Sequence, residues 1–255
     1  MGAILHPESR KALKYIQFMM KTFSPLIGLL GFLITLLVPS ITQANGWELV
    51  FEAENLLVQR RDYEGSNLKE IKGVTRVKAS LNAVMALLKD AEFNHHWVYR
   101  SGGATILQEV GYAQAYVYGI VDAPWPMRDR DTVVRFDYRQ DTVTKAITIA
   151  ITNFPGLIAT KNEFVRVPKF GGYWTLQPEK DGWVEVIYQV YGDPGGWIPV
   201  WVANHAAVIS VKKTLHNMRS AVARYGSAQS EFVEEVALPG ESVTEAAIGS
   251  SLNPR

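Results

Sequence analysis

The stretch Asp193–Gly226, DPGGWIPVWVANHAAVISVKKTLHNMRSAVARYG, decides the fold of this chain. Its first four residues form a strong turn signal, and Pro199 suits the first position of a helix. Gly226 can adopt the left-handed conformation that often ends a helix. The sequence therefore predicts one long helix between Pro199 and Gly226, roughly 39 Å long at about 1.5 Å per residue.

The apolar residues of this helix recur every three or four positions, which places them in one stripe. The stripe consists of Trp201, Val208, Val211, Leu215, Met218, Val222 and Tyr225, and Ser210, Lys213, Asn217 and Arg224 fall opposite. The stripe must cover an apolar surface. The helix is about as long as a whole sheet is wide, so a sheet could provide that surface.

Asn204 interrupts the stripe where an apolar residue is expected. A buried amide without partners costs roughly 1–3 kcal/mol, so its side chain is expected to form hydrogen bonds. Two kinds of partner are open: the backbone of a neighbouring turn, or the polar end of a bound ligand.

The rest of the chain after residue 46 reads mainly as strands and turns. Residues 47–63 enter a strand, residues 64–67 form a turn, and Leu68–Lys78 alternates as a strand does. Ser80 can cap a short helix from Leu81 to Leu88. Further strand signals cover residues 106–110, 113–121, 132–138, 142–152, 164–167, 173–178 and 183–191, with turn residues between them.

Consecutive strands with short links predict an antiparallel meander. We therefore expect an α+β fold in which a strongly curved antiparallel sheet wraps around the long C-terminal helix. The candidate inward-facing residues include several small ones, namely Ala113, Ala115, Gly119, Ala146 and Ala150. Small inward side chains leave a hollow, which predicts a hydrophobic cavity suited to an apolar ligand.

Composition excludes several classes of function. The chain has 255 residues, a formal charge of +1 and no cysteine. No run of Lys and Arg is present, so nucleic acid is not an expected partner. Disulfides, thiol catalysis and cysteine-based zinc sites are excluded. His95 and His96 are adjacent, and on a strand they would point to opposite faces, so no metal site is expected there.

The N-terminus has the pattern of a targeting segment. Phe23–Val38 is an apolar run, and the small residues Thr42 and Ala44 suit cleavage after Ala44. We predict that residues 1–44 are a signal peptide, with Met20 as a possible true start. A soluble exported protein without disulfides fits a bacterial periplasm; the alternative is that the apolar segment remains as a membrane anchor.

Residues 45–226 are then predicted to form the folded domain. Residues 227–255 are rich in Ala, Ser, Glu and Gly, a composition that predicts a disordered acidic tail.

The order and spacing of several motifs resemble the START (StAR-related lipid-transfer) domain family over residues 47–226. The matching segments are Ala123–Pro126 with Arg128–Asp131, then Phe164–Val167, then Gly172–Pro178, then Asp193–Pro199 followed by Asn204. The resemblance implies a helix-grip fold in which the curved sheet and the C-terminal helix enclose one lipid. An exported protein departs from the commonest cytosolic setting of this family.

The resemblance and the residue chemistry together suggest a lipid site. Asn204, Arg130 and Arg166 are the polar candidates, and Trp97, Trp201, Val208 and Ile209 are the apolar ones. A buried arginine needs an acceptor, so Arg130 and Arg166 bind either a structural carboxylate or a ligand head group.

A gate is expected at Gly195, Gly196 and Trp197, because glycines permit a hinge before the helix. Trp125, residues 155–158 and residues 195–199 combine apolar side chains with turns, which indicates a cavity mouth that touches a membrane transiently. The expected ligand is a single sterol, phospholipid or fatty acid carried between membranes, with no cofactor or metal, by a monomer.

Two other classes of function remain open. Related helix-grip proteins include polyketide cyclases and aromatases, and His205 on the flank of the stripe is the best acid–base candidate. His216 lies about 16 Å along the helix, too far to share a proton or metal with it. The third class is an interaction module that uses the fold without a ligand.

Overall fold

The computed structural model describes residues 46–230 and residue 233. The predicted signal peptide, residues 1–44, lies outside the described residues, as does residue 45. Of the predicted tail, only residues 227–230 and 233 are described, so neither prediction is tested by the structure.

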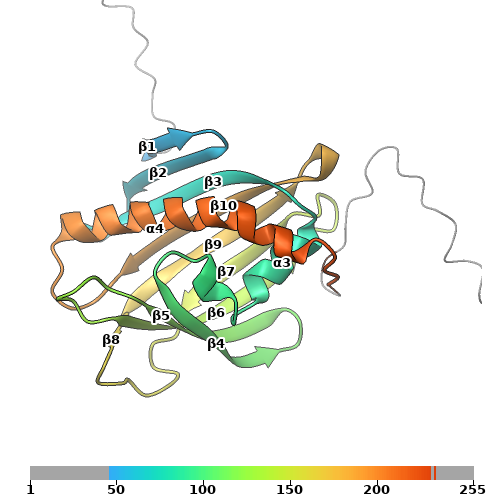
Figure 1. Ribbon diagram of the computed structural model, residues 1–255. Coiled ribbons are helices and arrows are strands. Elements are labelled where there is room, and N and C mark those ends of the chain that lie inside the picture. The colour runs from blue at the N-terminus through green and yellow to red at the C-terminus, as the bar shows by residue number, and fades with distance from the viewer. Residues whose placement is uncertain (1–45, 231–232, 234–255) are drawn as a thin grey trace, which may run out of the picture. The chain divides into compact units, whose positions relative to one another are not determined.

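The described residues form a ten-stranded sheet, with β8 pairing outside the main path (Figure 1). The order along that path is β1-β2-β3-β10-β9-β7-β6-β5-β4. The strands are β1 (Glu48–Ala53), β2 (Leu56–Asp62), β3 (Lys69–Lys78), β4 (Ser101–Val110), β5 (Gln114–Val121), β6 (Arg130–Gln140), β7 (Ile147–Asn153), β8 (Val165–Arg166), β9 (Lys169–Pro178) and β10 (Trp183–Asp193). Neighbours on the path are antiparallel, whereas β8 pairs with β6 in parallel.

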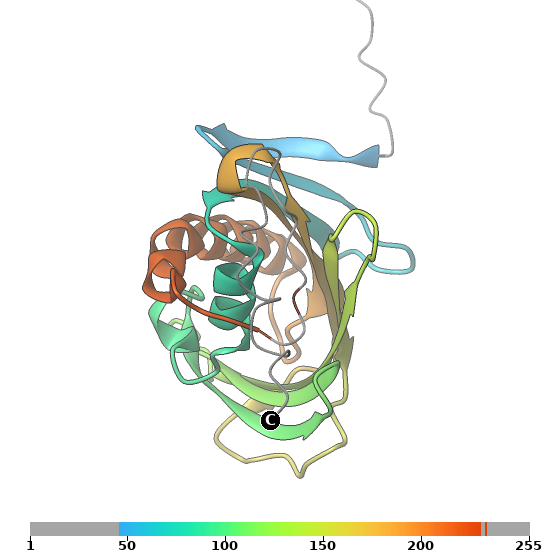
Figure 2. The same cartoon turned by 90° about the vertical axis from the view of Figure 1, so that its right-hand side faces the viewer.

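Two α-helices and three short 3₁₀ helices complete this part of the chain. They are α3 (Leu81–Lys89), η3 (Asn94–His96), η4 (Lys180–Gly182), α4 (Val200–Ala221) and η5 (Val222–Tyr225). Figure 1 shows α4 running across one face of the sheet, and the end-on view in Figure 2 shows the sheet curving around α3 and α4. The predicted α+β helix-grip architecture is confirmed.

The helical stripe packs as predicted over most of its length. Val211, Leu215, Met218 and Val222 are buried in the core. Trp201 is 74% exposed, so the prediction that it begins the buried stripe is wrong. Gly226 has a φ of −56° and is not left-handed, because the helix tightens into η5 instead of ending in a glycine cap.

Contact between α4 and the sheet depends on Gly73 of β3. A Cβ atom there would lie 2.4 Å from Leu215 Cδ1 and 2.6 Å from Val211 Cγ1. Only a glycine lets the helix approach this strand so closely. The helix therefore lies directly on β3, near one side of the sheet.

The short helix after β3 forms as predicted. The Ser80 hydroxyl accepts a hydrogen bond from the Ala83 N–H at 3.1 Å, which caps α3.

Three local predictions need correction. Residues 47–63 enter strand structure as predicted but form two strands, because Asn55 adopts a φ of +58° and turns the chain between β1 and β2. His95 and His96 lie in η3, not on a strand. The strand expected at 164–167 pairs in parallel, outside the antiparallel meander.

The small residues expected on the inner face divide between the two faces. Ala115 pairs with Phe136 and Gly119 with Thr132, whereas Ala150 pairs with Asp137. Because side chains alternate along β6, Phe136 and Thr132 project to one face and Asp137 to the other. Ala150 therefore lies on the outer face, and the prediction for it is wrong. Ala113 and Ala146 lie just outside the strands.

Candidate functional site

One row of side chains crosses the face of the sheet that α4 covers. The register pairs Gly73 with Tyr188, Tyr188 with Trp174, Trp174 with Ile149, and Ile149 with Tyr138. Paired residues project to the same side of a sheet, and Gly73 meets α4, so the whole row faces the helix. The rings of Trp174 and Tyr188 stack with their centroids 3.8 Å apart.

Several apolar residues that face this region are only half-buried. They are Tyr188, Phe136 and Val117 on the sheet and Ala207 and Val208 on α4. Burial nevertheless raises the pKa of Tyr188 well above the usual value for a phenol. Because these side chains face the covered side of the sheet and keep accessible surface, α4 and the sheet do not pack fully against each other there. The candidate site is this space between α4 and the sheet.

A cleft of about 430 Å³ lies at the β4 edge of the same face. It is lined by the end of α3 and the following residues, Lys89–Glu92, and by Ala104–Ile106 of β4. Ala104 pairs with Gly119 and Ile106 with Val117, so both project to the side that faces α4. No pattern in the sequence indicates this cleft, because it joins segments that share no common signal.

Trp174 and Tyr138 also belong to the site, although the sequence did not predict them there. One signal pointed to this face: Val184, Val186 and Tyr188 alternate along one side of their strand. Extending that signal to Trp174 and Tyr138 requires the register between β10, β9, β7 and β6, which a single sequence does not provide.

Trp97 is buried beside this row, with its ring centroid 6.3 Å from that of Trp174. Its indole Nε1 is buried and has no hydrogen-bond acceptor among the described residues. The Asn217 side chain donates to the Trp97 carbonyl at 3.0 Å, which joins the segment after α3 to α4. That contact turns Asn217 inward, although its spacing placed it opposite the stripe.

Asn204 has backbone partners. Its Oδ1 accepts a hydrogen bond from the Lys69 N–H at 2.8 Å, and its Nδ2 donates to the Asn67 carbonyl at 3.3 Å. Of the two kinds of partner that the sequence left open, the structure shows the turn between β2 and β3. Asn204 fastens the first half of α4 to that turn.

The remaining apolar candidates on α4 differ in their surroundings. Val208 is half-buried and packs against the core. Ile209 is half-buried one position further on. Trp201 is exposed near the start of the helix. Of these three residues, Val208 is the one that packs against the core on the face of α4 that lies over the sheet.

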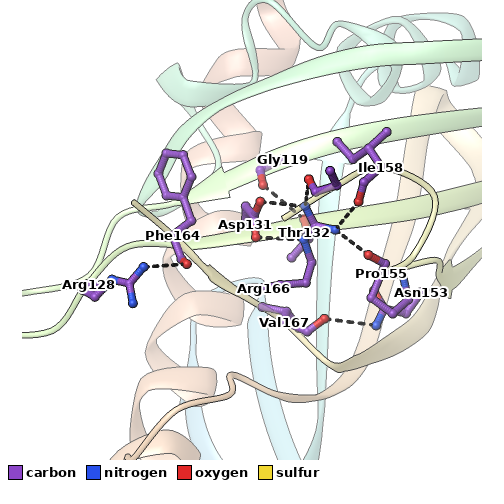
Figure 3. Close-up of polar contacts among 11 residues, drawn as sticks. Gly119, Arg128, Asp131, Thr132, Asn153, Pro155, Ile158, Phe164, Arg166 and Val167 are labelled. Atoms are coloured by element: carbon purple, nitrogen blue, oxygen red, sulfur yellow. Dashed lines mark hydrogen bonds and ion pairs between the residues drawn. The ribbon is translucent and has the colours of Figure 1, made fainter. Parts of the chain in front are cut away.

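Arg166 is held by a complete set of protein acceptors, as Figure 3 shows. Its Nε and Nη2 donate to the two carboxylate oxygens of Asp131, each at 2.9 Å. Its guanidinium also donates to the carbonyls of Pro155, Ile158 and Ala159. Asp131 is 1% exposed, and the ion pair holds the pKa of its carboxyl below the usual range. Arg166 thus has the structural partner that the sequence left open.

Arg130 is buried as well, with 7% of its surface exposed. Its Nη1 donates to the Arg128 carbonyl. Its Nε is buried and has no acceptor, and no ion pair to Arg130 forms among the described residues. The two neighbouring arginines therefore differ sharply, since one is saturated and the other is largely unpartnered.

The predicted gate residues lie over Arg130. Gly195 and Gly196 have φ values of +68° and +70°, which glycine adopts readily. A Cβ at Gly196 would lie 3.9 Å from Arg130 Nη2, and a Cβ at Gly195 would lie 3.2 Å from Val165 Cγ1. Trp197, next in the chain, is 92% exposed.

Three loops lie at the end of the sheet where β6 begins and β10 ends. We call this region the loop end, and it consists of residues 122–129, 154–164 and 194–199. Trp125 and Trp197 are each 92% exposed there, and Leu157 is 47% exposed. The loop end therefore presents large apolar side chains to solvent.

The four histidines among the described residues, His95, His96, His205 and His216, are all exposed. Within residues 46–230 and 233, no group of three or more His, Cys, Asp or Glu side chains could hold a metal ion. The helices described in this part of the chain are too short or too polar to cross a membrane.

Comparison with known proteins gives consistent matches over the folded region. A family model described as START domain matches residues 41–227. An uncharacterised protein of Pseudomonas aeruginosa is 34% identical over 178 residues, covering 70% of this chain and 87% of that protein. A phosphatidylcholine transfer protein of Rattus norvegicus is 25% identical over 196 residues, covering 73% of this chain and 88% of that protein.

A solved structure agrees with these matches. The crystal structure of a STAR-related lipid transfer protein fragment from Xanthomonas axonopodis superposes with a TM-score of 0.66 at 35% sequence identity. The match covers 70% of this chain and 99% of that chain. The fold, the matched family model and these two bacterial relatives agree, and the chain belongs to the START domain family.

Proposed function

We propose that this protein binds one lipid between α4 and the sheet and carries it between membranes. The observation that carries the proposal is the set of half-buried apolar residues that face each other there, from Tyr188 and Phe136 on the sheet to Val208 on α4. Acyl chains or a sterol in this space would gain about 25 cal/mol for each Å² of apolar surface removed from water. Membership of the START family and the lipid-transfer relatives support the same ligand class.

A non-catalytic role fits the described residues better than the cyclase or aromatase alternative. His205 was the best acid–base candidate, and its side chain points into solvent at an exposed position of α4. General acid–base catalysis requires a group within hydrogen-bond reach of the reacting atoms. The relatives compared above that have a functional name are lipid transfer proteins.

Loading and release require a route to the bilayer, and we propose the loop end for it. Trp125 and Trp197 are exposed on the loops before β6 and before α4, and tryptophan favours the membrane–water interface. The glycine turn at Gly195 and Gly196 would open the space under α4 when these loops meet a membrane. The protein would act there as a monomer with transient membrane contact.

We further propose that this binding takes place after export, in a bacterial periplasm. The apolar run Phe23–Val38 and the cleavage pattern at Ala44 support the proposal. The alternative, an uncleaved membrane anchor, predicts the full-length N-terminus on the membrane-bound protein. N-terminal sequencing of the protein from an exporting host separates the two, because cleavage leaves Asn45 as the first residue.

Native mass spectrometry of the full chain, purified without detergent, tests lipid binding. We expect one bound lipid per protein molecule, and extraction followed by lipid mass spectrometry identifies it. A protein that arrives empty and takes up no lipid from vesicles would contradict the proposal. It would favour the ligand-free interaction module or the cyclase-like enzyme.

A further inference from the structure

Arg130 begins β6 on the face of the sheet that α4 covers. Side chains alternate along a strand, so every second residue of β6 projects to the same face as Arg130. These residues are Thr132, Val134, Phe136 and Tyr138. On either side it pairs with Val121 of β5 and Val165 of β8. The arginine therefore stands at the loop end of the candidate site, at the opposite end of β6 from Tyr138.

The charge on Arg130 forms no ion pair with any acidic side chain among the described residues. Asp131, the next residue, gives both carboxylate oxygens to Arg166. Asp129 accepts a hydrogen bond from the Ala123 N–H at 2.8 Å, and it forms no ion pair with Arg130. The charge of Asp129 nevertheless favours the cation on Arg130, and the exposed like charge of Arg128 opposes it.

A buried arginine that forms no ion pair, such as Arg130, lowers the stability of the folded protein. Burial lowers the pKa of Arg130, although arginine remains protonated near neutral pH. A buried cation without an anionic partner costs several kcal/mol. The same loops supply acceptors for the whole guanidinium of Arg166. The lack of acceptors at Arg130 is therefore not a general property of this region.

The unpartnered atoms of Arg130 share one edge of the guanidinium. The bond to the Arg128 carbonyl uses Nη1, whereas Nε has no acceptor and Nη2 makes no hydrogen bond within residues 46–230 and 233. The Nε–Nη2 edge carries two parallel N–H groups, which match two oxygens of a carboxylate or phosphate. Nη2 faces the Gly196 position at 3.9 Å, where the missing side chain leaves room.

We propose that Arg130 binds the anionic group of the lipid, either a phosphate or a carboxylate, through its Nε–Nη2 edge under the Gly195–Gly196 turn. This inference rests on the proposed lipid binding and narrows it to acidic lipids. The lipid would lie with its anionic end at the loop end and its apolar part along Phe136, Tyr138 and Trp174. Sterols and diacylglycerols, which lack an anion, would bind more weakly.

The test compares lipids that share acyl chains and differ in charge. The full chain, stripped of co-purified lipid, is incubated separately with palmitoyl-oleoyl phosphatidylglycerol, with oleic acid and with palmitoyl-oleoyl diacylglycerol, and bound lipid is measured by native mass spectrometry. We expect at least one of the two acids to bind about tenfold or more tightly than diacylglycerol, as one bidentate charge-assisted contact allows. The phosphatidylglycerol and oleic acid arms distinguish a phosphate from a carboxylate.

Substitutions of single arginines test whether Arg130 is the residue that causes the preference for acidic lipids. Arg130→Gln should reduce binding of the preferred acid to the level of diacylglycerol while leaving diacylglycerol binding unchanged, and Arg130→Lys should keep part of the preference. Arg139→Gln is the control, because it removes an exposed arginine charge at the other end of β6 and should preserve the preference.

Three outcomes would overturn the inference: equal binding of acids and diacylglycerol by the unmodified protein, an unchanged preference in Arg130→Gln, or loss of the preference in Arg139→Gln. The first is measured without any variant, so the inference remains testable if Arg130→Gln does not fold. Uptake of diacylglycerol without preference would refute the inference and leave the proposed function intact. Failure to bind any of the three lipids would refute both.

Discussion

At the scale of single residues, the two buried arginines beside Asp131 show how one carboxylate can organise a site. Asp131 is fully engaged by Arg166, and this contact anchors the loop of residues 154–164 to β6. Arg130, the preceding residue of β6, projects to the opposite face of the sheet and forms no ion pair with Asp131. A structural ion pair and an arginine without an ion pair therefore occupy adjacent positions of one strand, on opposite faces of the sheet.

Asp131→Asn should destabilise the protein by about 3–5 kcal/mol near neutral pH, because it leaves Arg166 buried without its counterion. The folded-state pKa of Asp131 lies below its unfolded value, so the ionised carboxylate contributes its stability above about pH 4. That contribution is lost as the pH falls through the folded-state pKa. The difference in unfolding free energy between the two proteins should therefore narrow below about pH 4. Urea titrations from pH 7 to pH 2 measure it, and a constant difference would contradict an ionised pair.

Single residues of the site could be identified from the sequence, but their partners could not. Asn204 was identified because it breaks a helical period, but its partners lie in a turn more than 130 positions earlier, as its bond to Lys69 shows. Periodicity cannot name a partner at that separation. Arg130 and Arg166 gave the same signal from sequence, and only the geometry around Asp131 distinguishes them.

At the scale of elements, the contact between α4 and β3 depends on a missing side chain. Gly73→Val should push α4 away from the sheet and destabilise the protein by about 1–3 kcal/mol, because its added atoms would overlap Leu215 and Val211. Gly156→Ala is the matched control, since no atom lies within 4 Å of the added Cβ. Thermal unfolding measures both variants. Equal effects would show that α4 does not depend on close approach at Gly73.

The turn before α4 offers a second test at this scale. Because the chain has no cysteine, the pair Gly195→Cys with Val165→Cys introduces the only two thiols. A Cβ at position 195 lies 3.2 Å from Val165 Cγ1, which brings a disulfide within reach.

If the turn is the gate, oxidation of this pair should slow lipid exchange between vesicles at least about tenfold, and reduction of the same protein should restore it. The reduced double variant controls for strain at the glycine position. Unchanged exchange rates in the oxidised protein would exclude this turn as the gate.

Elements with a strong local period were predicted correctly, and those set by distant contacts were not. The stripe from Val211 to Val222 is buried because the sheet lies beneath it, whereas Trp201 extends beyond that contact and remains exposed. The two histidines were assigned to a strand although a 3₁₀ turn holds them, since short helices leave little periodic signal. The parallel partner of β8 depends on a loop path that the sequence does not specify.

At the scale of the whole molecule, the exposed tryptophans of the loop end should control membrane contact. Replacing both Trp125 and Trp197 with Ala should weaken vesicle binding about tenfold or more, because two large aromatic side chains no longer enter the interface. Val143→Ala is the control, since Val143 is 86% exposed at the other end of β6. Vesicle co-flotation measures binding. Equal loss in the control would point to non-specific association.

The pairing of β3 with β10 has a consequence for how the protein is made. Lys78 lies opposite Trp183, so β3 and β10 become neighbours only after the intervening hundred or so residues have been brought together. A chain emerging from the ribosome therefore holds β1 to β3 without their main partner until β10 has been synthesised. Such long-range closure favours slow folding. The folded domain should therefore form only after β10 has been synthesised, and until then chaperones can engage the unpaired strands.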